Sequence, residues 1–372
     1  MIPVFDPYLG EEELNNVGDC VKRGMISGMI RGDYTGEFEK LASAGCETRY
    51  GVTTTSGTTA LALAVASLGL GPSDEVLVPA ITNIATAFAV VYSGAKPVFL
   101  DSENVTWNLD PDRIRERITP RTRAIIPVHI YGHPVDMDPV MKIAQEFGLY
   151  VIEDAAEAQG AEYRGRKVGG IGHVGCLSFY INKVITTGEG GMLVTNDEQI
   201  AERARFLKNL GYSSHDKFTH TDLAYNFRMT NLQAAVGVAQ MHRIEEIIER
   251  KRRVAAMYTE RLRDIPGLQL PVEQPWVKNV YWMYTIILRD DLPDRQHVRD
   301  YLADEGIETR NFFHPLHKQP VFLKMNIVSE TDSLPVSEDL GRRGFYLPSS
   351  PLLDEPTIDL ICEKLRKALN SG

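Results

Sequence analysis

Short apolar runs alternate with longer helix-like segments between residues 50 and 200. The apolar runs have strand length and are Glu75–Pro79, Pro97–Asp101, Arg123–Ile130 and Leu149–Asp154. The helix-like segments are Thr59–Leu70, Ile84–Ser93, Val135–Phe147 and a polar helix, DPDRIRERI, that Asp110 opens with proline at its first position. This alternation predicts an α/β fold class, with a mostly parallel sheet that helices cover on both faces.

The pattern changes after Gly160. The segment YRGRKVGG has hairpin chemistry, and VGCLSFY and GMLVTND predict two further strands. An amphipathic helix is expected at Asp197–Leu210, and a long helical stretch runs from Asn231 to about Asp264. Prolines at positions 266, 271 and 275 then indicate a boundary between structural units.

The remainder of the chain predicts a smaller α/β unit. It contains the apolar run VYWMYTIILRD and helical segments at Arg295–Glu305 and Thr357–Leu369. We therefore expect a large domain at residues 1–240 and a small C-terminal domain at residues 241–372 that begins with the long linking helix. The N-terminal segment, about the first 20 residues, could pack on the small domain.

Composition narrows the class of protein. The chain has 372 residues, of which 43% are hydrophobic and 24% charged, and a net charge of −10. These values are typical of a soluble globular protein and argue against a nucleic-acid partner. The longest apolar stretches are too short to span a membrane, and the N-terminus lacks the apolar core of a signal peptide. The four cysteines have no metal-type spacing, so we expect a cytoplasmic protein without a metal site.

The segment TTTSGTTALALA places small hydroxyl residues and a glycine before an apolar helix. Free N–H groups at a helix start suit a phosphate, and here Gly57 would permit close approach while Thr58 adds a hydroxyl. An ordinary Ser/Thr N-cap is the alternative, because the segment is neither a G-x-G-x-x-G nor a Walker loop.

Two more residues stand where such sheets place their ligands. Asp154 ends the apolar strand LYVIED, and a carboxylate there could pair with a protonated ring nitrogen or cap the next turn. Lys183 lies between an apolar strand and a glycine-rich turn, where desolvation would make its amine nucleophilic, although a lone lysine is usually solvated. Together the three features are the parts that pyridoxal phosphate requires.

The chain resembles the DegT/DnrJ-type nucleotide-sugar aminotransferases, which are fold-type I pyridoxal phosphate enzymes. The resemblance is carried by IEDAAEAQGAEYRGRKVGG, LSFYINKVITTGEGGMLVTND and YNFRMTNLQAAVGVAQ, and it extends from PVFDPYLG to LPSSP. It implies an aspartate aminotransferase-like fold with a mostly parallel, seven-stranded sheet in the large domain and a smaller C-terminal α/β domain.

The resemblance also implies roles for single residues. Lys183 matches the catalytic lysine that carries the cofactor as a Schiff base, Asp154 the partner of the pyridinium nitrogen, and Glu157 a residue near the ring hydroxyl. The implied phosphate ligands are Gly57, Thr58 and Ser178. The resemblance also implies a homodimer with shared active sites, in which Asn226 of each subunit binds the phosphate in the other subunit's site. The implied substrate contacts are Arg228, Arg310, Phe313, His314 and His317.

Two positions depart from the family pattern. Asn83 in VPAITNIATA stands where the family usually has an aromatic residue stacked on the cofactor ring. It could hydrogen-bond to the cofactor or substrate instead, or it could be a turn or cap residue. Gln159 stands where several members have histidine.

The implied reaction moves an amino group from L-glutamate to a nucleotide-linked keto sugar. The segments TWNLDP, YWMYTI and RNFFHPLH look most like the GDP-perosamine synthase branch, which aminates C4 of GDP-4-keto-6-deoxymannose for O-antigen and lipopolysaccharide biosynthesis. A UDP- or dTDP-linked keto sugar is the alternative substrate. Lys183 argues against a sugar dehydratase, which has histidine there, and against an idle scaffold, while the lack of G-x-G-x-x-G argues against a nicotinamide dehydrogenase.

Overall fold

The computed structural model describes residues 1–28, 33–212, 218–289 and 291–371. Its central sheet is formed by β1 (Tyr50–Thr54), β2 (Glu75–Pro79), β3 (Lys96–Leu100), β4 (Thr122–Ile125), β5 (Tyr150–Asp154), β8 (Val174–Ser178) and β9 (Gly191–Thr195). The spatial order is β1-β9-β8-β5-β4-β2-β3, and within this sheet β9 alone runs antiparallel to its neighbours. The predicted mostly parallel, seven-stranded sheet is confirmed.

Both faces of this sheet are buried, as the apolar strands predict. Successive strand residues point to opposite faces, so Leu77 and Val151 join one core while Val76 and Ile152 join the other. Helices on the first face include α2 (Asp33–Gly45), α5 (Met137–Phe147) and α7 (Asn231–His242). Helices on the second face include α3 (Gly57–Ser67), α4 (Ala85–Tyr92) and α6 (Glu198–Lys208).

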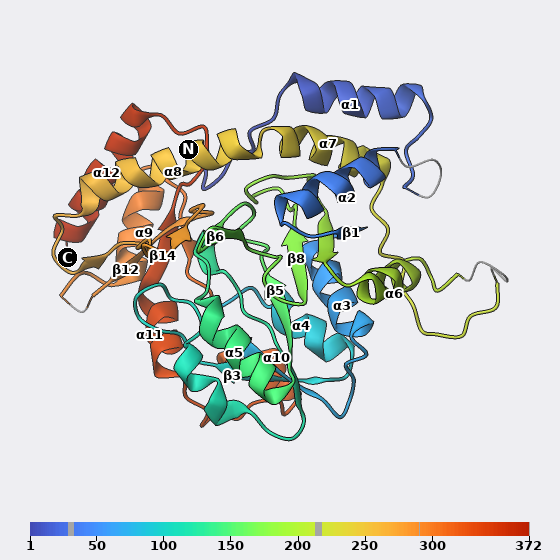
Figure 1. The fold of residues 1–372 in the computed structure, drawn as a ribbon. Coiled ribbons are helices and arrows are strands. Elements are labelled where there is room, and N and C mark those ends of the chain that lie inside the picture. The colour runs from blue at the N-terminus through green and yellow to red at the C-terminus, as the bar shows by residue number, and fades with distance from the viewer. Residues whose placement is uncertain (29–32, 213–217, 290, 372) are drawn as a thin grey trace.

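A second sheet lies to one side of the first (Figure 1). Its strands are β10 (Leu268–Gln269), β12 (Tyr284–Leu288), β13 (Arg310–Asn311) and β14 (Gly344–Leu347), all paired antiparallel in the order β10-β12-β14-β13. A third core joins this sheet to α8 (Ile244–Leu262), α9 (Arg295–Asp304) and α12 (Glu355–Asn370). The N-terminal segment reaches this part of the molecule, because Ile2 forms a β-bridge with Ile307.

The predicted hairpin is present. Its strands β6 (Glu162–Tyr163) and β7 (Arg166–Lys167) pair antiparallel, and β11 (Val277–Lys278) adds a third strand. Arg164 and Gly165 between them have φ values of 50° and 77°, as a two-residue type I′ turn requires. This pairing places residues 277 and 278 beside the hairpin, in a three-stranded sheet of the order β11-β6-β7.

Three predicted elements were wrong in extent. The helix expected from Asn231 to Asp264 is two helices, α7 and α8, because Arg243 leaves helical geometry at φ −113°. The segment DPDRIRERI forms only the 3₁₀ turns η1 (Pro111–Arg113) and η2 (Arg115–Arg117), since the residue before Pro120 disfavours a helix. The strand expected to reach Ile130 ends at Ile125, two residues before a proline that has no N–H to pair.

Among the residues that the structure describes, four helices were not predicted: α1 (Glu11–Lys22), α2, α10 (Pro320–Lys324) and α11 (Pro335–Arg343). Across the described residues, no helix is both long enough and apolar enough to span a lipid bilayer.

Candidate active site

The carboxyl ends of β1, β5 and β8 lie together at one edge of the large sheet. Ser56 follows β1 and caps α3 by accepting a hydrogen bond from the Thr59 backbone, so the helix begins at Gly57. Gly57 lies directly against Ser178, the last residue of β8, and a Cβ on Gly57 would lie 2.6 Å from the Ser178 Cβ. The α3 N-terminus and the Ser178 hydroxyl therefore form a cradle that suits a phosphate.

Asp154 ends β5 and is 4% exposed. Its Oδ2 accepts a hydrogen bond from Thr86 Oγ1 at 2.8 Å, and its Oδ1 accepts one from the Ala156 N–H at 3.2 Å. Burial raises the pKa of Asp154, and the hydrogen bond from Thr86 opposes that rise. Thr86 was missed by the sequence analysis, although Thr82 and Thr86 follow β2 at helical spacing and hydrogen-bond at 3.1 Å.

Glu157 and Lys183 complete a buried group of charges with Asp154. Glu157 accepts a hydrogen bond from the Tyr131 N–H at 2.8 Å, and burial raises its pKa to about 7. Lys183 is 9% exposed, which excludes the solvated alternative for this lysine. Burial lowers the pKa of Lys183, and the charges of Glu157 and Asp154 oppose that change.

The loop that carries Lys183 is held from three sides. Trp282 Nε1 donates to the Asn182 carbonyl at 2.7 Å, immediately before the lysine. On the other side of the lysine, the Ile185 N–H donates to Gln159 Oε1 at 3.2 Å, and Gln159 Nε2 donates to the Ser178 carbonyl. Gln159 thus joins the end of β8 to the lysine loop.

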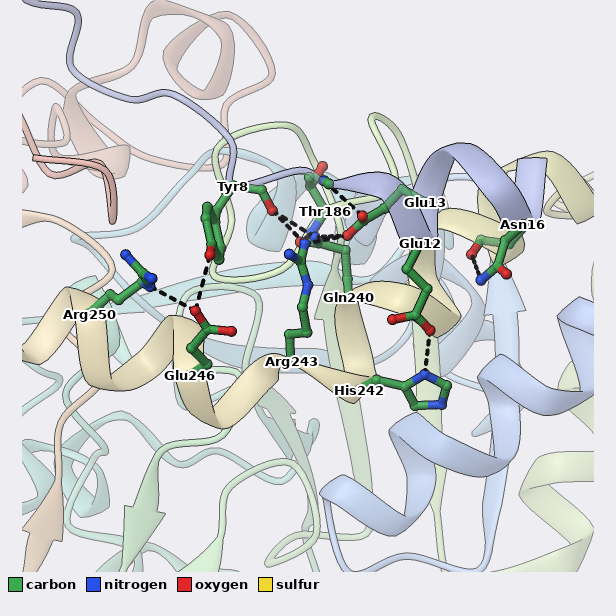
Figure 2. A network of polar contacts seen from close by, with 12 residues as sticks. Tyr8, Glu12, Glu13, Asn16, Thr186, Gln240, His242, Arg243, Glu246 and Arg250 are labelled. Carbon is green, nitrogen blue, oxygen red and sulfur yellow. Dashed lines mark hydrogen bonds and ion pairs between the residues drawn. The ribbon is translucent and has the colours of Figure 1, made fainter. Parts of the chain in front are cut away.

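The third anchor is Gln240 of α7, which is 1% exposed. Its Oε1 accepts from the Thr186 N–H at 3.3 Å, while its Nε2 donates to the Tyr8 carbonyl at 2.9 Å and to Glu13 Oε1 at 2.6 Å. Glu13 also forms an ion pair with Arg243 at 2.5 Å. Figure 2 shows this network, which connects the lysine loop through α7 to α1.

A row of aromatic rings borders the charged group. Tyr131 stacks on Phe313 at 5.3 Å and 8°, and on Trp282 at 6.0 Å and 13°. Tyr131 has a φ of 51°, and the following Gly132 approaches the backbone of the 281–282 segment so closely that a Cβ would lie 2.8 Å from Trp282 N. Phe313 reaches the site through its stack on Tyr131, whereas Tyr131 and Trp282 were not among the predicted site residues, because nothing in their local sequence marks a role for either ring.

The other predicted residues lie around this centre. Asn83 is exposed, and its Oδ1 accepts from the Ala85 N–H at 3.0 Å, a turn just before α4, whose N-cap is Ile84. Asn226 is exposed and forms a β-bridge with Asn209. Arg228 donates to Asn209 Oδ1 at 3.0 Å, so this short segment is ordered against the end of α6.

The segment RNFFHPLH is spread over different surroundings. Arg310 is exposed and pairs with Glu308 at 2.5 Å, and His314 is exposed on another cavity. His317 is buried, donates from Nε2 to Glu338 Oε1 at 2.9 Å, and lines a separate cavity of about 180 Å³. Phe313 is the member of this predicted set that contacts the aromatic row.

The residues present fit pyridoxal phosphate. A phosphate cradle, a buried carboxylate whose raised pKa calls for a cationic partner, and a desolvated amine lie at one sheet edge. Within the described ranges, no three His, Cys, Asp or Glu side chains are grouped as a metal ion would need.

Comparison with known proteins agrees with this geometry. The profile of the DegT/DnrJ/EryC1/StrS aminotransferase family matches residues 7–366. GDP-perosamine synthase of Escherichia coli O157:H7 is 40% identical over 366 residues, covering 98% of each chain, and that of Caulobacter vibrioides is 40% identical over 373 residues, covering 99% of this chain and 98% of the other. S. venezuelae DesV, solved with a ketimine intermediate, superposes with a TM-score of 0.90 at 36% identity, over 97% of this chain and 95% of its own. The chain therefore belongs to the DegT/DnrJ/EryC1/StrS aminotransferase family.

Proposed function

We propose that this protein is a pyridoxal phosphate-dependent aminotransferase that moves the amino group of L-glutamate to C4 of GDP-4-keto-6-deoxymannose and so forms GDP-perosamine. The observation that carries the proposal is the buried group of Asp154, Glu157 and Lys183 beside the α3 cradle, in a chain that aligns end to end with GDP-perosamine synthases. Synthesis of this sugar in the cytoplasm for O-antigen and lipopolysaccharide is part of the proposal.

The large-domain residues have distinct proposed roles. When bound, pyridoxal phosphate supplies an electron sink for the carbanion at the donor Cα. Asp154 holds the proton on the ring nitrogen, and the Thr86 hydroxyl orients that carboxylate. The phosphate is proposed to bind Gly57, Thr58 and Ser178 at the α3 N-terminus, where backbone N–H groups and the helix dipole favour an anion.

Lys183 is proposed to act both as the nucleophile that holds the cofactor and as the group that moves the proton. Desolvation depresses its pKa, so more of the side chain is free amine near neutral pH than for an exposed lysine. The Nζ atom can then take the proton from the donor Cα in the first half of the reaction. In the second half it can give a proton to the sugar carbon that receives the amine. Glu157 is proposed to lie near the ring hydroxyl, and Asn83 to contact the cofactor or substrate through its free amide group.

The substrate side is proposed to include Arg228, Arg310, Phe313, His314 and His317. Phe313 has the clearest support because it stacks on Tyr131, whose N–H bonds to Glu157. The division into a large domain at residues 1–240 and a small domain at 241–372 would let such residues approach by domain movement.

A homodimer with shared active sites is also proposed. Asn226 would serve the phosphate of the partner's site. Support comes from the exposed apolar side chains in the same segment, since Phe218 is 79% and Leu223 87% exposed. Exposed large apolar groups beside a polar residue are typical of an interface.

The test is incubation of the purified protein and cofactor with L-glutamate and a panel of GDP-, UDP- and dTDP-linked 4-keto-6-deoxy sugars. We expect a GDP-linked product with an amine at C4, identified by mass and NMR. A dTDP- or UDP-amino sugar as the preferred product would contradict the GDP assignment; the 37% identical dTDP-3-amino-3,4,6-trideoxy-alpha-D-glucose transaminase of Streptomyces venezuelae makes that arm necessary. A deoxy product without an amine would contradict transamination itself.

A further inference from the structure

Trp282 meets the lysine in two ways at once. Its ring centroid lies 3.8 Å from Lys183 Nζ, within the range in which an aromatic face attracts a cation. Its Nε1–H donates to the carbonyl of Asn182, the residue just before the lysine, at 2.7 Å. One side chain therefore contacts both the reacting nitrogen and the backbone from which that nitrogen extends.

The protein fixes the Trp282 ring in this position. Trp282 is 4% exposed and stacks on Tyr131, which in turn stacks on Phe313. The Phe313 N–H also donates to Tyr131 Oη at 3.2 Å. Phe313, Tyr131, Trp282 and the Lys183 ammonium thus form one continuous stack, and the indole has little freedom to turn away.

The two carboxylates near the lysine already have hydrogen-bond partners, so the Lys183 ammonium needs a further stabilising contact. Asp154 already holds two hydrogen bonds and Glu157 is bonded to the Tyr131 N–H. The ammonium of a lysine that is not bonded to the cofactor must still be stabilised in a buried site. The indole face supplies that stabilisation at 3.8 Å without neutralising either carboxylate.

We propose that Trp282 is a catalytic residue of the proposed transamination: its ring face holds the ammonium that Lys183 forms each time its free amine takes up a proton, and its N–H fixes the backbone that aims the lysine. The proposal rests on the proposed function. In that cycle Nζ receives a proton from the donor Cα and becomes an ammonium group. The ring would hold this cation in place until Nζ passes the proton to the cofactor carbon, after which the lysine is again a neutral amine.

The ring contribution can be measured on the full-length protein freed of cofactor. The pH dependence of Lys183 acetylation by acetic anhydride, followed by peptide mass spectrometry, gives the pKa of that single amine. Because a cation–π contact favours the charged form, W282L should lower the midpoint by about one pH unit. W282F keeps a ring face and should stay within about half a unit of the parent protein.

W276L is the matched control, since Trp276 lies in the same segment but packs on His133 and Tyr163. Its midpoint should equal that of the parent protein. A folded W282L protein with an unchanged midpoint would overturn the role of the ring. Should W282L fail to fold, W282M, which fills more of the volume without a ring, provides the same comparison.

The backbone contribution has its own readout. W282F cannot donate to the Asn182 carbonyl, so amide hydrogen exchange should become faster at residues 182–187 and stay unchanged elsewhere. Exchange equal to the parent protein in that segment would overturn the anchoring role. Neither measurement needs turnover, so a wild-type protein that aminates no sugar in the panel would contradict the proposed function while leaving the Trp282 comparison fully readable.

Discussion

Replacement of Thr86 by valine removes one hydroxyl and preserves the side-chain shape. Thr86 is fully buried, and its Oγ1 donates to Asp154 Oδ2 at 2.8 Å. A hydrogen bond to a charged group contributes about 1.5–3 kcal/mol, and 1.36 kcal/mol corresponds to one pKa unit. Since Thr86 favours the ionised carboxylate, T86V should raise the pKa of Asp154 by about one to two units above its already elevated value.

The effect should be visible in the pH profile of kcat/KM. In the proposed mechanism Asp154 must be ionised to hold the proton of the cofactor ring, so activity should fall on the acid side as this carboxylate becomes protonated. In T86V that acid limb should move to higher pH by about one to two units, while the alkaline limb stays in place. T86S keeps a hydroxyl and should restore most of the parent profile.

The shift of the acid limb distinguishes a change in the pKa of Asp154 from a loss of packing around Thr86. A cavity or a local shift would lower activity at every pH and would leave the limb where it was. A folded T86V protein with the parent acid limb would refute the claim that Thr86 sets the ionisation of Asp154.

Three further predictions follow from the same geometry. Burial raises the pKa of Glu157 to about 7, so the stability that the protonated side chain contributes is fully present below about pH 4.5 and is lost as pH rises through 7. The free energy of unfolding of cofactor-free E157Q should therefore exceed that of the cofactor-free parent by about 1–3 kcal/mol between pH 5 and 8 in chemical denaturation. The exposed control E116Q should show no such gain. The K183A and N226A proteins should each have little transaminase activity alone. If Asn226 serves the partner's site, an equal mixture of the two that is unfolded and refolded together should recover about a quarter of the parent activity. A mixture without recovered activity would argue against shared sites. G57A places a methyl group in the cradle and should weaken cofactor binding at least tenfold by equilibrium titration, a result that unchanged affinity would contradict.

The sheet and the charged centre could be predicted because each depends on local sequence. The run that ends at Asp154 has strand length and apolar composition, and parallel strands bring their carboxyl ends to one edge. The glycine-containing start of α3 follows the same logic. Lys183 needed the resemblance as well, because a lone lysine between a strand and a turn carries little information.

The remainder depends on contacts between distant segments. Trp282 lies 99 positions after Lys183, and nothing in YWMYTI distinguishes a ring beneath an ammonium from an ordinary core residue. The break between α7 and α8 arises at the single residue Arg243, whose guanidinium bonds to the Tyr8 carbonyl and to Glu13. Helical periodicity continues through such a break, so pattern analysis joins the two helices.

The three anchors of the lysine loop also constrain how the protein is made. They come from residues 159, 240 and 282, so the last of them is added only when three quarters of the chain has been synthesised. Chains grow by about 5–20 residues per second, and until that moment a nascent large sheet would expose the lysine without its full support. Pyridoxal phosphate is therefore expected to bind late, close to the end of synthesis. Cells that lack vitamin B6 should accumulate the full-length protein without cofactor, and not incomplete chains.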